Sequence, residues 1–100
     1  MKMNSKPNAR QRLLCEGYDD VAFFSNYSYD DALIGVTDDN RAVYDFDKMV
    51  EWLSKDEGWS IYECIEWIEC NTIAQLPFWG DKCPVIMYPL RNLKEVNSEQ

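Results

Sequence analysis

The sequence predicts an α+β fold, in which a small, mostly antiparallel sheet of three or more strands is packed by an N-terminal helix and a central helix pair. Three observations support this prediction. Residues 45–76 carry two consecutive amphipathic helical patterns, residues 32–44 contain two apolar runs around turn-forming residues, and residues 85–88 form a further short apolar run. We expect a single domain at residues 9–91, between a flexible basic tail at 1–8 and a polar tail at 92–100.

The first helical pattern starts after Asp45, a suitable N-cap, and ends before Gly58, which suits the left-handed position after a helix. Its apolar positions follow the i, i+3, i+4, i+7 spacing of a buried helix face. These positions are Phe46, Met49, Val50 and Leu53, with Trp52 beside them.

The second helical pattern starts after Ser60, which forms a predicted capping box with Glu63 three residues later. The expected inner face consists of Ile61, Cys64, Ile65, Ile68 and Thr72. The expected outer face consists of Glu63, Glu66, Trp67, Glu69 and Cys70. No lysine or arginine lies between Ser60 and Ile73, so the sequence predicts an outer face whose acids are not neutralised within the helix.

The remaining elements are shorter. A helix is expected at about Ala9–Glu16, with Leu13, Leu14 and Cys15 pointing inward. Strands are predicted at Val21–Phe24, Ala32–Val36, Arg41–Tyr44 and Val85–Tyr88. The second and third of these would form a hairpin around residues 37–41, and Gly35 is expected to mark a bulge or a close packing contact.

The charge of the chain is strongly negative and unevenly distributed. The net charge is −8 and the sequence pI is near 4.3. Residues 1–14 contribute +4, residues 15–81 contribute −13 and residues 82–100 contribute +1. A folded segment with this excess of negative charge repels nucleic acid and membrane headgroups and attracts basic surfaces. We therefore expect neither nucleic acid nor membrane as a direct partner.

The absence of histidine from the sequence excludes several kinds of catalytic site. Neither a Ser-His-Asp nor a Cys-His nucleophile can form, and no metal site can use an imidazole ligand. The four cysteines show no C-x-x-C spacing, and no secretory signal precedes them, which predicts reduced thiols in a cytoplasmic protein. We therefore expect a protein that is not an enzyme and has no cofactor.

Paired aspartates raise the question of a metal site. The pairs are Asp19-Asp20, Asp30-Asp31 and Asp38-Asp39. A calcium loop starting at Asp38 would need glycine where Val43 stands. A solvated acidic surface is the favoured interpretation, and a metal-binding or metal-dependent enzyme module using converging aspartates is the alternative.

The helix pair also resembles a DNA-binding helix-turn-helix in outline, but its second helix has no basic residue to contact phosphates. The inverse hypothesis is that carboxylates present a phosphate-like array to a protein that grips nucleic acid. An acidic surface that only maintains solubility is the simpler interpretation of composition alone. The candidate partner-binding residues are Glu63, Glu66, Glu69, Asp38 and Asp39 for charge, and Trp67 and Trp79 as anchors.

Three runs of the sequence, YDDALIGVTDDNRAVYDFDKMVEWL, IEWIECNTIAQLP and PVIMYPL, span residues 29–90 with gaps. In these runs the chain resembles a group of small acidic uncharacterised proteins of Firmicutes phages and mobile elements. Such elements often encode anti-defence proteins, including anti-CRISPR inhibitors. The resemblance implies a binder that blocks a host nuclease or effector, and it supplies no catalytic motif.

Together these observations lead to one hypothesis and two alternatives. The hypothesis is a non-enzymatic inhibitor, acting in the host cytoplasm, whose acidic surface docks on the basic surface of a nucleic-acid-handling defence protein as a possible DNA mimic. The alternatives are the metal module and a structural or accessory phage protein. Homodimer formation is also left open.

Overall fold

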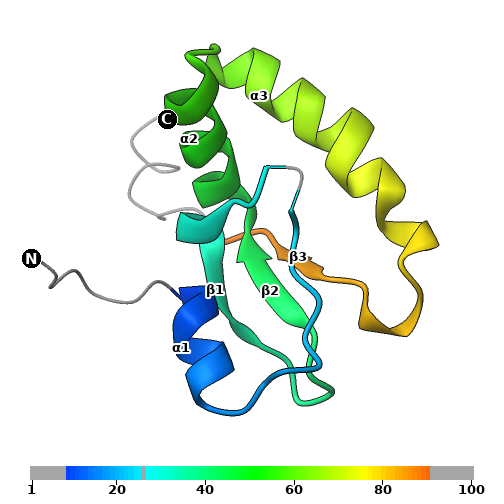
Figure 1. Ribbon diagram of the computed structural model, residues 1–100. Coiled ribbons are helices and arrows are strands. Elements are labelled where there is room, and N and C mark those ends of the chain that lie inside the picture. Colours follow the sequence, from blue (N-terminus) through cyan, green and yellow to red (C-terminus); the bar gives the residue numbers. More distant parts are fainter. Residues whose placement is uncertain (1–8, 26, 91–100) are drawn as a thin grey trace, which may run out of the picture.

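The computed structural model describes residues 9–25 and 27–90 (Figure 1). The predicted tails at 1–8 and 92–100 lie outside the described residues. The helical segments are α1 (Ala9–Cys15), η1 (Asp30–Ala32), α2 (Phe46–Glu57), α3 (Ile61–Trp67), η2 (Ile68–Thr72), η3 (Ile73–Phe78) and η4 (Gly80–Lys82). The strands are β1 (Leu33–Val36), β2 (Ala42–Asp45) and β3 (Val85–Met87). The predicted α+β class is confirmed.

The sheet has the order β1-β2-β3, with β2 in the centre. Strands β1 and β2 form the predicted antiparallel hairpin, in which Val36 lies opposite Ala42. The register shifts between Leu33 and Gly35, as expected for a bulge at Gly35. The hairpin loop closes with a hydrogen bond from the Thr37 amide to the Arg41 carbonyl at 2.8 Å.

The third strand pairs in parallel with β2, so the three-stranded sheet is mixed, with one antiparallel and one parallel pairing. Two strands can run in parallel only if the chain crosses back between them. Here the whole helix pair provides that crossover: it leaves the end of β2, turns at the far end of the molecule and returns to the start of β3 (Figure 1).

Helix α2 begins and ends as the sequence predicts. The Asp45 carboxylate accepts a hydrogen bond from the Lys48 amide at 3.1 Å, and Gly58 adopts the left-handed conformation with φ of 75°. The four positions assigned to its inner face are all buried. Because Asp45 also ends β2, the central strand leads directly into α2.

Segments α3, η2 and η3 form one continuous helical rod that changes its winding along its length (Figure 1). The rod starts with the predicted capping box: the Glu63 amide donates to the Ser60 hydroxyl at 3.2 Å, and the Ser60 amide donates to the Glu63 carboxylate at 2.9 Å. The winding is α-helical through Trp67, π-helical over Ile68–Thr72 and 3₁₀ over Ile73–Phe78. A π-helical turn is rare in proteins and occurs often at functional sites.

The inner face of this rod begins later than predicted. Cys64, Ile68 and Thr72 are buried, but Ile61 is 50% exposed. Ile61 is the first residue of α3, so it lies in the exposed turn between the helices before the rod reaches the body of the protein. The prediction for Ile61 is therefore wrong.

The predicted strand at Val21–Phe24 is also wrong, because this stretch pairs with no strand. It belongs to an irregular segment that we call the strap, which comprises the described residues 18–25 and 27–29. Val21 and Phe24 are buried, and the Phe24 backbone bonds to side chains: its amide donates to the Tyr44 hydroxyl at 3.2 Å, and its carbonyl accepts from Arg10 at 3.0 Å. Side chains thus replace the hydrogen bonds of a sheet.

Helix α1 lies beside β1, and fewer of its residues pack inward than the sequence predicts. Ala9 and Leu13 pack against the core, whereas Leu14 is 47% exposed and Cys15 is exposed. The expectation that Leu14 and Cys15 point inward is wrong, because a two-turn helix resting on one strand buries only residues about four apart.

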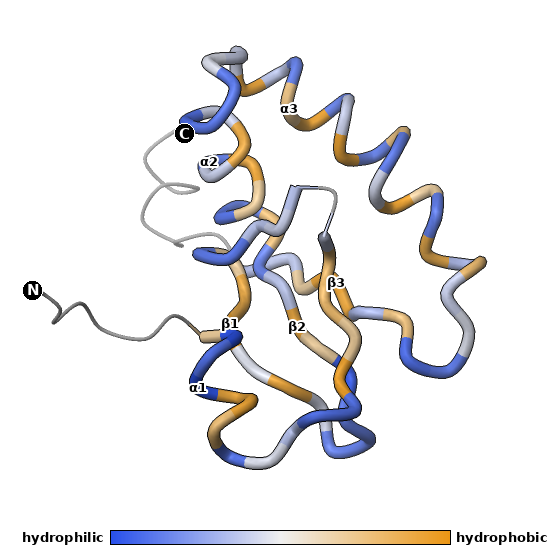
Figure 2. Tube along the Cα trace, viewed as in Figure 1, coloured by the Kyte–Doolittle hydropathy of each residue, from blue (hydrophilic) through white to orange (hydrophobic). Residues whose placement is uncertain are grey.

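The apolar residues of the helices, the hairpin and the strap form one core (Figure 2). Hydrophilic residues are found at the turn between α2 and α3 and at the β1–β2 hairpin at the opposite end, as well as along α1 and the rod (Figure 2). Among the described residues, no helix is both long enough and apolar enough to span a membrane.

Candidate functional site

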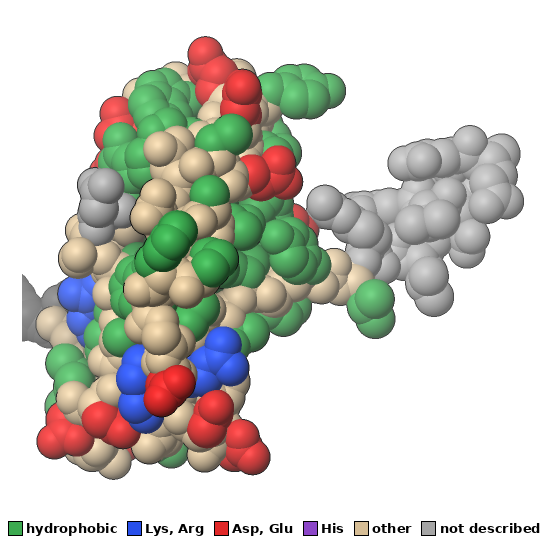
Figure 3. All heavy atoms as spheres, turned by 90° about the vertical axis from the view of Figure 1, so that its right-hand side faces the viewer, with side chains coloured by type: hydrophobic (Ala, Val, Ile, Leu, Met, Phe, Trp, Pro, Cys, Tyr) green, Lys and Arg blue, Asp and Glu red, His purple; other side chains and the backbone are tan. Residues whose placement is uncertain are grey.

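Acidic side chains gather at both ends of the face that carries the rod, with apolar side chains between them (Figure 3). At the end formed by the helix pair, this face shows acids without lysine or arginine. At the hairpin end, blue basic side chains lie among the acids (Figure 3). The two ends therefore present different electrostatic surfaces, although both are rich in carboxylates.

A groove of about 390 Å³ runs along the rod at the helix end. We call it the acidic groove, and its lining residues are Trp59, Glu63, Glu66, Trp67, Cys70 and Asn71. Glu63, Glu66 and Trp67 are at positions i, i+3 and i+4 of α3, which places them on one face. Residues that carry two carboxylates and two indole rings thus line one shallow, open depression.

Local hydrogen bonds hold several of these groups in place. One oxygen of the Glu63 carboxylate caps the Ser60 amide, so this side chain is fixed before any ligand arrives. The Trp59 carbonyl accepts a hydrogen bond from the Ser54 hydroxyl at 2.8 Å, which ties the interhelical turn to α2. The Asn71 side-chain amide donates to the Trp67 carbonyl at 3.0 Å in the π-helical turn.

Trp67 is half-buried, which differs from its predicted position on an outer face. Its ring lies 4.9 Å from the Tyr27 ring and 6.4 Å from the Trp59 ring, measured between centroids. The strap brings Tyr27 against the rod, and the Tyr27 hydroxyl donates to the Glu57 carboxylate at 2.7 Å. This hydrogen bond, together with desolvation and the charge of Glu57, raises the pKa of Tyr27 to about 12.

The strap is strained where it meets the rod. Tyr27 and Tyr29 both have positive φ values, of 62° and 52°, which are uncommon for bulky residues. Tyr29 is fully buried, and its hydroxyl lies 2.9 Å from the Thr72 hydroxyl in the π-helical turn. Burial raises the pKa of Tyr29 above its ordinary value. The aromatic floor under the acidic groove is therefore fixed by contacts from a distant part of the chain.

A second pocket of about 390 Å³ lies between the strap and the rod. We call it the amide pocket, and its lining residues are Phe24, Ser25, Trp67, Asn71, Thr72, Gln75 and Trp79. It shares Trp67 and Asn71 with the acidic groove, so the two depressions adjoin. Trp79 is half-buried here, with its ring centroid 5.5 Å from that of Phe24.

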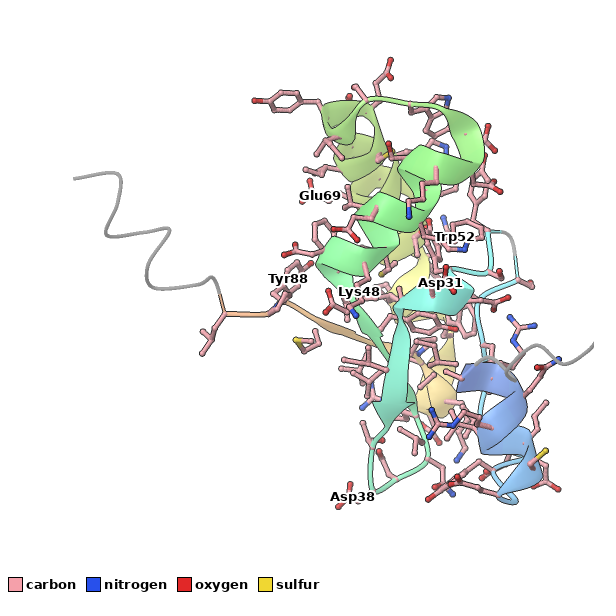
Figure 4. All side chains as sticks on the ribbon, turned by 90° about the vertical axis from the view of Figure 1, so that its left-hand side faces the viewer. Asp31, Asp38, Lys48, Trp52, Glu69 and Tyr88 are labelled. Carbon is pink, nitrogen blue, oxygen red and sulfur yellow. The ribbon has the colours of Figure 1, made fainter. Side chains whose placement is uncertain are left out.

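The hairpin acids occupy a different site from the helix acids. Asp38 lies at the hairpin tip, far from Glu69 on the rod (Figure 4). At this end the Lys82 ammonium lies 3.1 Å from the Asp20 carboxylate and 3.5 Å from the Asp39 carbonyl. The hydrogen bond from Lys82 holds the pKa of Asp20 below its ordinary value, and a hydrogen bond from Thr37 does the same for Asp39.

The structure thus does not bring the predicted binding residues together at one site. Glu63, Glu66 and Trp67 share the acidic groove, whereas Asp38 and Asp39 lie at the other end and Trp79 lies in the amide pocket. Glu69 is exposed but does not line the groove. The large aromatic side chains that are most exposed are Tyr62, at 87%, and Phe78, at 81%, and neither was among the predicted anchors. Hydrophobicity alone gave no signal that would have singled them out.

The described residues contain no group of three or more acidic or cysteine side chains placed to hold a metal ion. At the hairpin, the position between Asp20 and Asp39 holds the ammonium of Lys82. Burial and the nearby Glu63 raise the pKa of the Cys64 thiol, which favours the unreactive protonated form.

Comparisons with protein-family models, curated proteins and solved structures find no match to this chain. The resemblance to phage and mobile-element proteins therefore stays a prediction from the sequence.

Proposed function

We propose that this chain is a non-enzymatic binding protein, whose helix end docks on a basic, nucleic-acid-handling surface of another protein and blocks it. The observation that carries this proposal is the acidic groove, which Glu63 and Glu66 line together with two tryptophans. Neither carboxylate has a lysine or arginine within ion-pair distance in the described part of the chain. A partner with basic residues would supply the missing counter-charges.

The spacing of the glutamates supports competition with nucleic acid. Glu63 and Glu66 are three residues apart on α3, which places their backbone positions about 4.5 Å apart along the helix axis. Phosphates on one strand of B-DNA recur about every 3.4 Å along its axis. A surface built to contact a phosphate backbone would find a similar, shorter array here.

The sequence has no histidine, which excludes catalysis by an imidazole group. From the sequence resemblance we infer the setting: an inhibitor from a phage or mobile element, anti-CRISPR-like, that acts on a defence protein in the host cytoplasm.

The test uses three forms of the full chain as immobilised bait in a bacterial lysate. These are the wild type, the reversal E63K/E66K/E69K at the helix end, and the matched reversal D19K/D38K/D39K at the hairpin end. The wild type and the hairpin variant should retain a nucleic-acid-binding protein at low salt and release it at high salt. The helix variant should bind that partner roughly a hundredfold more weakly, because several charge pairs are replaced by repulsion.

The captured partner is then purified and loaded with fluorescently labelled nucleic acid. Addition of the wild-type chain should release the nucleic acid, and the helix variant should not. Equal capture by the helix variant and the wild type, or a partner whose nucleic acid stays bound, would contradict the proposal.

A further inference from the structure

The two tryptophans of the acidic groove indicate which partner group it binds. The centroids of Trp59 and Trp67 are 6.4 Å apart and their planes are inclined by 48°. Both rings line the same groove as the Glu63 and Glu66 carboxylates. A ligand that fills it must therefore satisfy two negative charges and also lie against aromatic surface. Cationic side chains have both properties, since they pair with carboxylates and are attracted to the faces of indole rings.

We propose that the acidic groove binds an arginine side chain of the partner, an inference that rests on the proposed function and specifies its contact. The guanidinium is planar, so it can stack on an indole ring while its edge donates hydrogen bonds to carboxylates. Glu63 and Glu66, three residues apart on α3, are placed on neighbouring positions of the helix surface. A compact lysine ammonium could pair with these carboxylates but could not stack in this way.

The groove is prepared for this ligand before it binds. The capping box fixes Glu63, and the Ser54 hydroxyl fixes the backbone at Trp59. Tyr27 packs against the Trp67 ring from the strap. Glu63 and Trp67 therefore lose little side-chain freedom on binding, which favours affinity for a single inserted side chain.

The adjoining amide pocket indicates where the rest of the partner segment lies. Ser25, Asn71 and Gln75 line it beside Trp67 and Trp79. Hydroxyl and amide side chains can both donate and accept hydrogen bonds, as peptide groups require. The residues next to the arginine would therefore run from the acidic groove into this pocket.

The experiment follows the indole N–H signals of the four tryptophans by NMR in ¹⁵N-labelled full-length protein. The probe is a short glycine–serine peptide with one central arginine, and two matched peptides carry lysine or citrulline instead. Citrulline keeps the shape of arginine without its charge. The arginine peptide should shift the signals of Trp59 and Trp67 and leave that of Trp52 in place. The lysine peptide should bind more weakly, and the citrulline peptide should cause no saturable shift.

Two charge-neutral variants locate the contact. E63Q/E66Q should weaken binding of the arginine peptide roughly tenfold to a hundredfold, since each lost partner is a charged hydrogen-bond acceptor. D38N/D39N removes the same charge at the hairpin and should change the affinity by less than about twofold at moderate salt. Unchanged circular dichroism and thermal unfolding confirm that both variants are folded.

Equal binding of the arginine, lysine and citrulline peptides, or a shift at Trp52 in place of Trp59 and Trp67, would overturn the arginine site. The lysate capture separates this result from a failure of the proposed function. If the triple helix reversal abolishes capture while the peptides show no preference for arginine, the helix end docks a basic partner through other contacts and only the groove assignment is wrong.

Discussion

The helix end and the hairpin end of this molecule both carry many carboxylates, but the two ends differ in whether a basic side chain lies beside them. At the hairpin, Lys82 reaches Asp20, and Asp39 accepts a hydrogen bond from Thr37. In the acidic groove, Glu63 and Glu66 face two tryptophans and no described basic side chain. A net charge of −8 alone would not distinguish these two ends. Local pairing decides which acids remain available to a partner.

The two ends also differ in what holds them to the body. The hairpin end uses polar contacts between distant segments, including the Arg41 hydrogen bond to the Cys83 carbonyl at 2.8 Å. The rod at the helix end relies on buried apolar contacts of Cys64 and Ile68 and on the strap tyrosines. Apolar attachment leaves Glu63 and Glu66 without an ion pair among the described residues, which suits a surface whose charges serve binding.

The largest expected effect tests this apolar attachment. Ile68→Ala removes a fully buried side chain between the rod and the core and should lower the free energy of unfolding by about 2–5 kcal/mol. The matched control is Ile61→Ala, which makes the same change at a position that is 50% exposed and should cost less than about 1 kcal/mol. Urea unfolding followed by tryptophan fluorescence measures both. Equal losses at the two positions would mean that the rod is not held by its inner face.

Local signals made the helix boundaries predictable. Asp45, Gly58 and the Ser60–Glu63 capping box act within a few residues of one another, so the sequence contains the whole interaction. The hairpin was predictable for the same reason. The parallel pairing of β3 was not, because it depends on where a crossover of about forty residues returns the chain.

The candidate site was only half predictable. Helical spacing placed Glu63 and Glu66 outside correctly, but it assigned Trp67 to an exposed face because no local signal shows that Tyr27 lies across it. The pairing of Lys82 with Asp20 joins residues far apart in the sequence. The sequence alone therefore does not distinguish an acid that is paired with a lysine from one that is not. Long-range contacts, and not residue type, divide the acids into two classes.

The second prediction concerns how the stability of the fold depends on alkaline pH through Tyr27, which contacts the helix end. Tyr27 has a folded-state pKa of about 12 against an ordinary value of 10.0, so its contribution to stability is complete below pH 10. Between these values the unfolded state releases the proton first, and stability must fall as pH rises. Tyr27→Phe should remove part of this loss, whereas Tyr62→Phe, at a side chain that is 87% exposed, should not.

Thermal unfolding measured from neutral pH to about pH 12 checks this expectation. Burial also raises the pKa values of Tyr29 and Tyr44, so a decline with the same sign should remain in the Tyr27→Phe variant. A Tyr27→Phe profile identical to that of the wild type would show that the Glu57 hydrogen bond does not link the strap to the helix end in solution.

The smallest expected effect concerns the ion pair between Lys82 and Asp20 at the hairpin end. Lys82→Met should raise the pKa of Asp20 toward its ordinary 3.8, because the hydrogen bond from Lys82 is the largest cause of its lowering. Asp39 is the internal control: its pKa is lowered chiefly by Thr37, with Lys82 the weakest contributor, so its titration should move much less. NMR titration of the carboxyl carbons reports both residues in one experiment.

A lowered carboxyl pKa stabilises the fold above the ordinary pKa and loses that contribution as pH falls through the lowered value. Lys82→Met should therefore reduce the part of the acid-pH dependence of stability that comes from Asp20. The stability at neutral pH should change little, because the ion pair is exposed. If Asp20 and Asp39 shifted equally, Lys82 would act as a diffuse charge and not as a partner of one carboxylate. The specific pairing of Lys82 with Asp20, on which the contrast between the two ends depends, would then be absent.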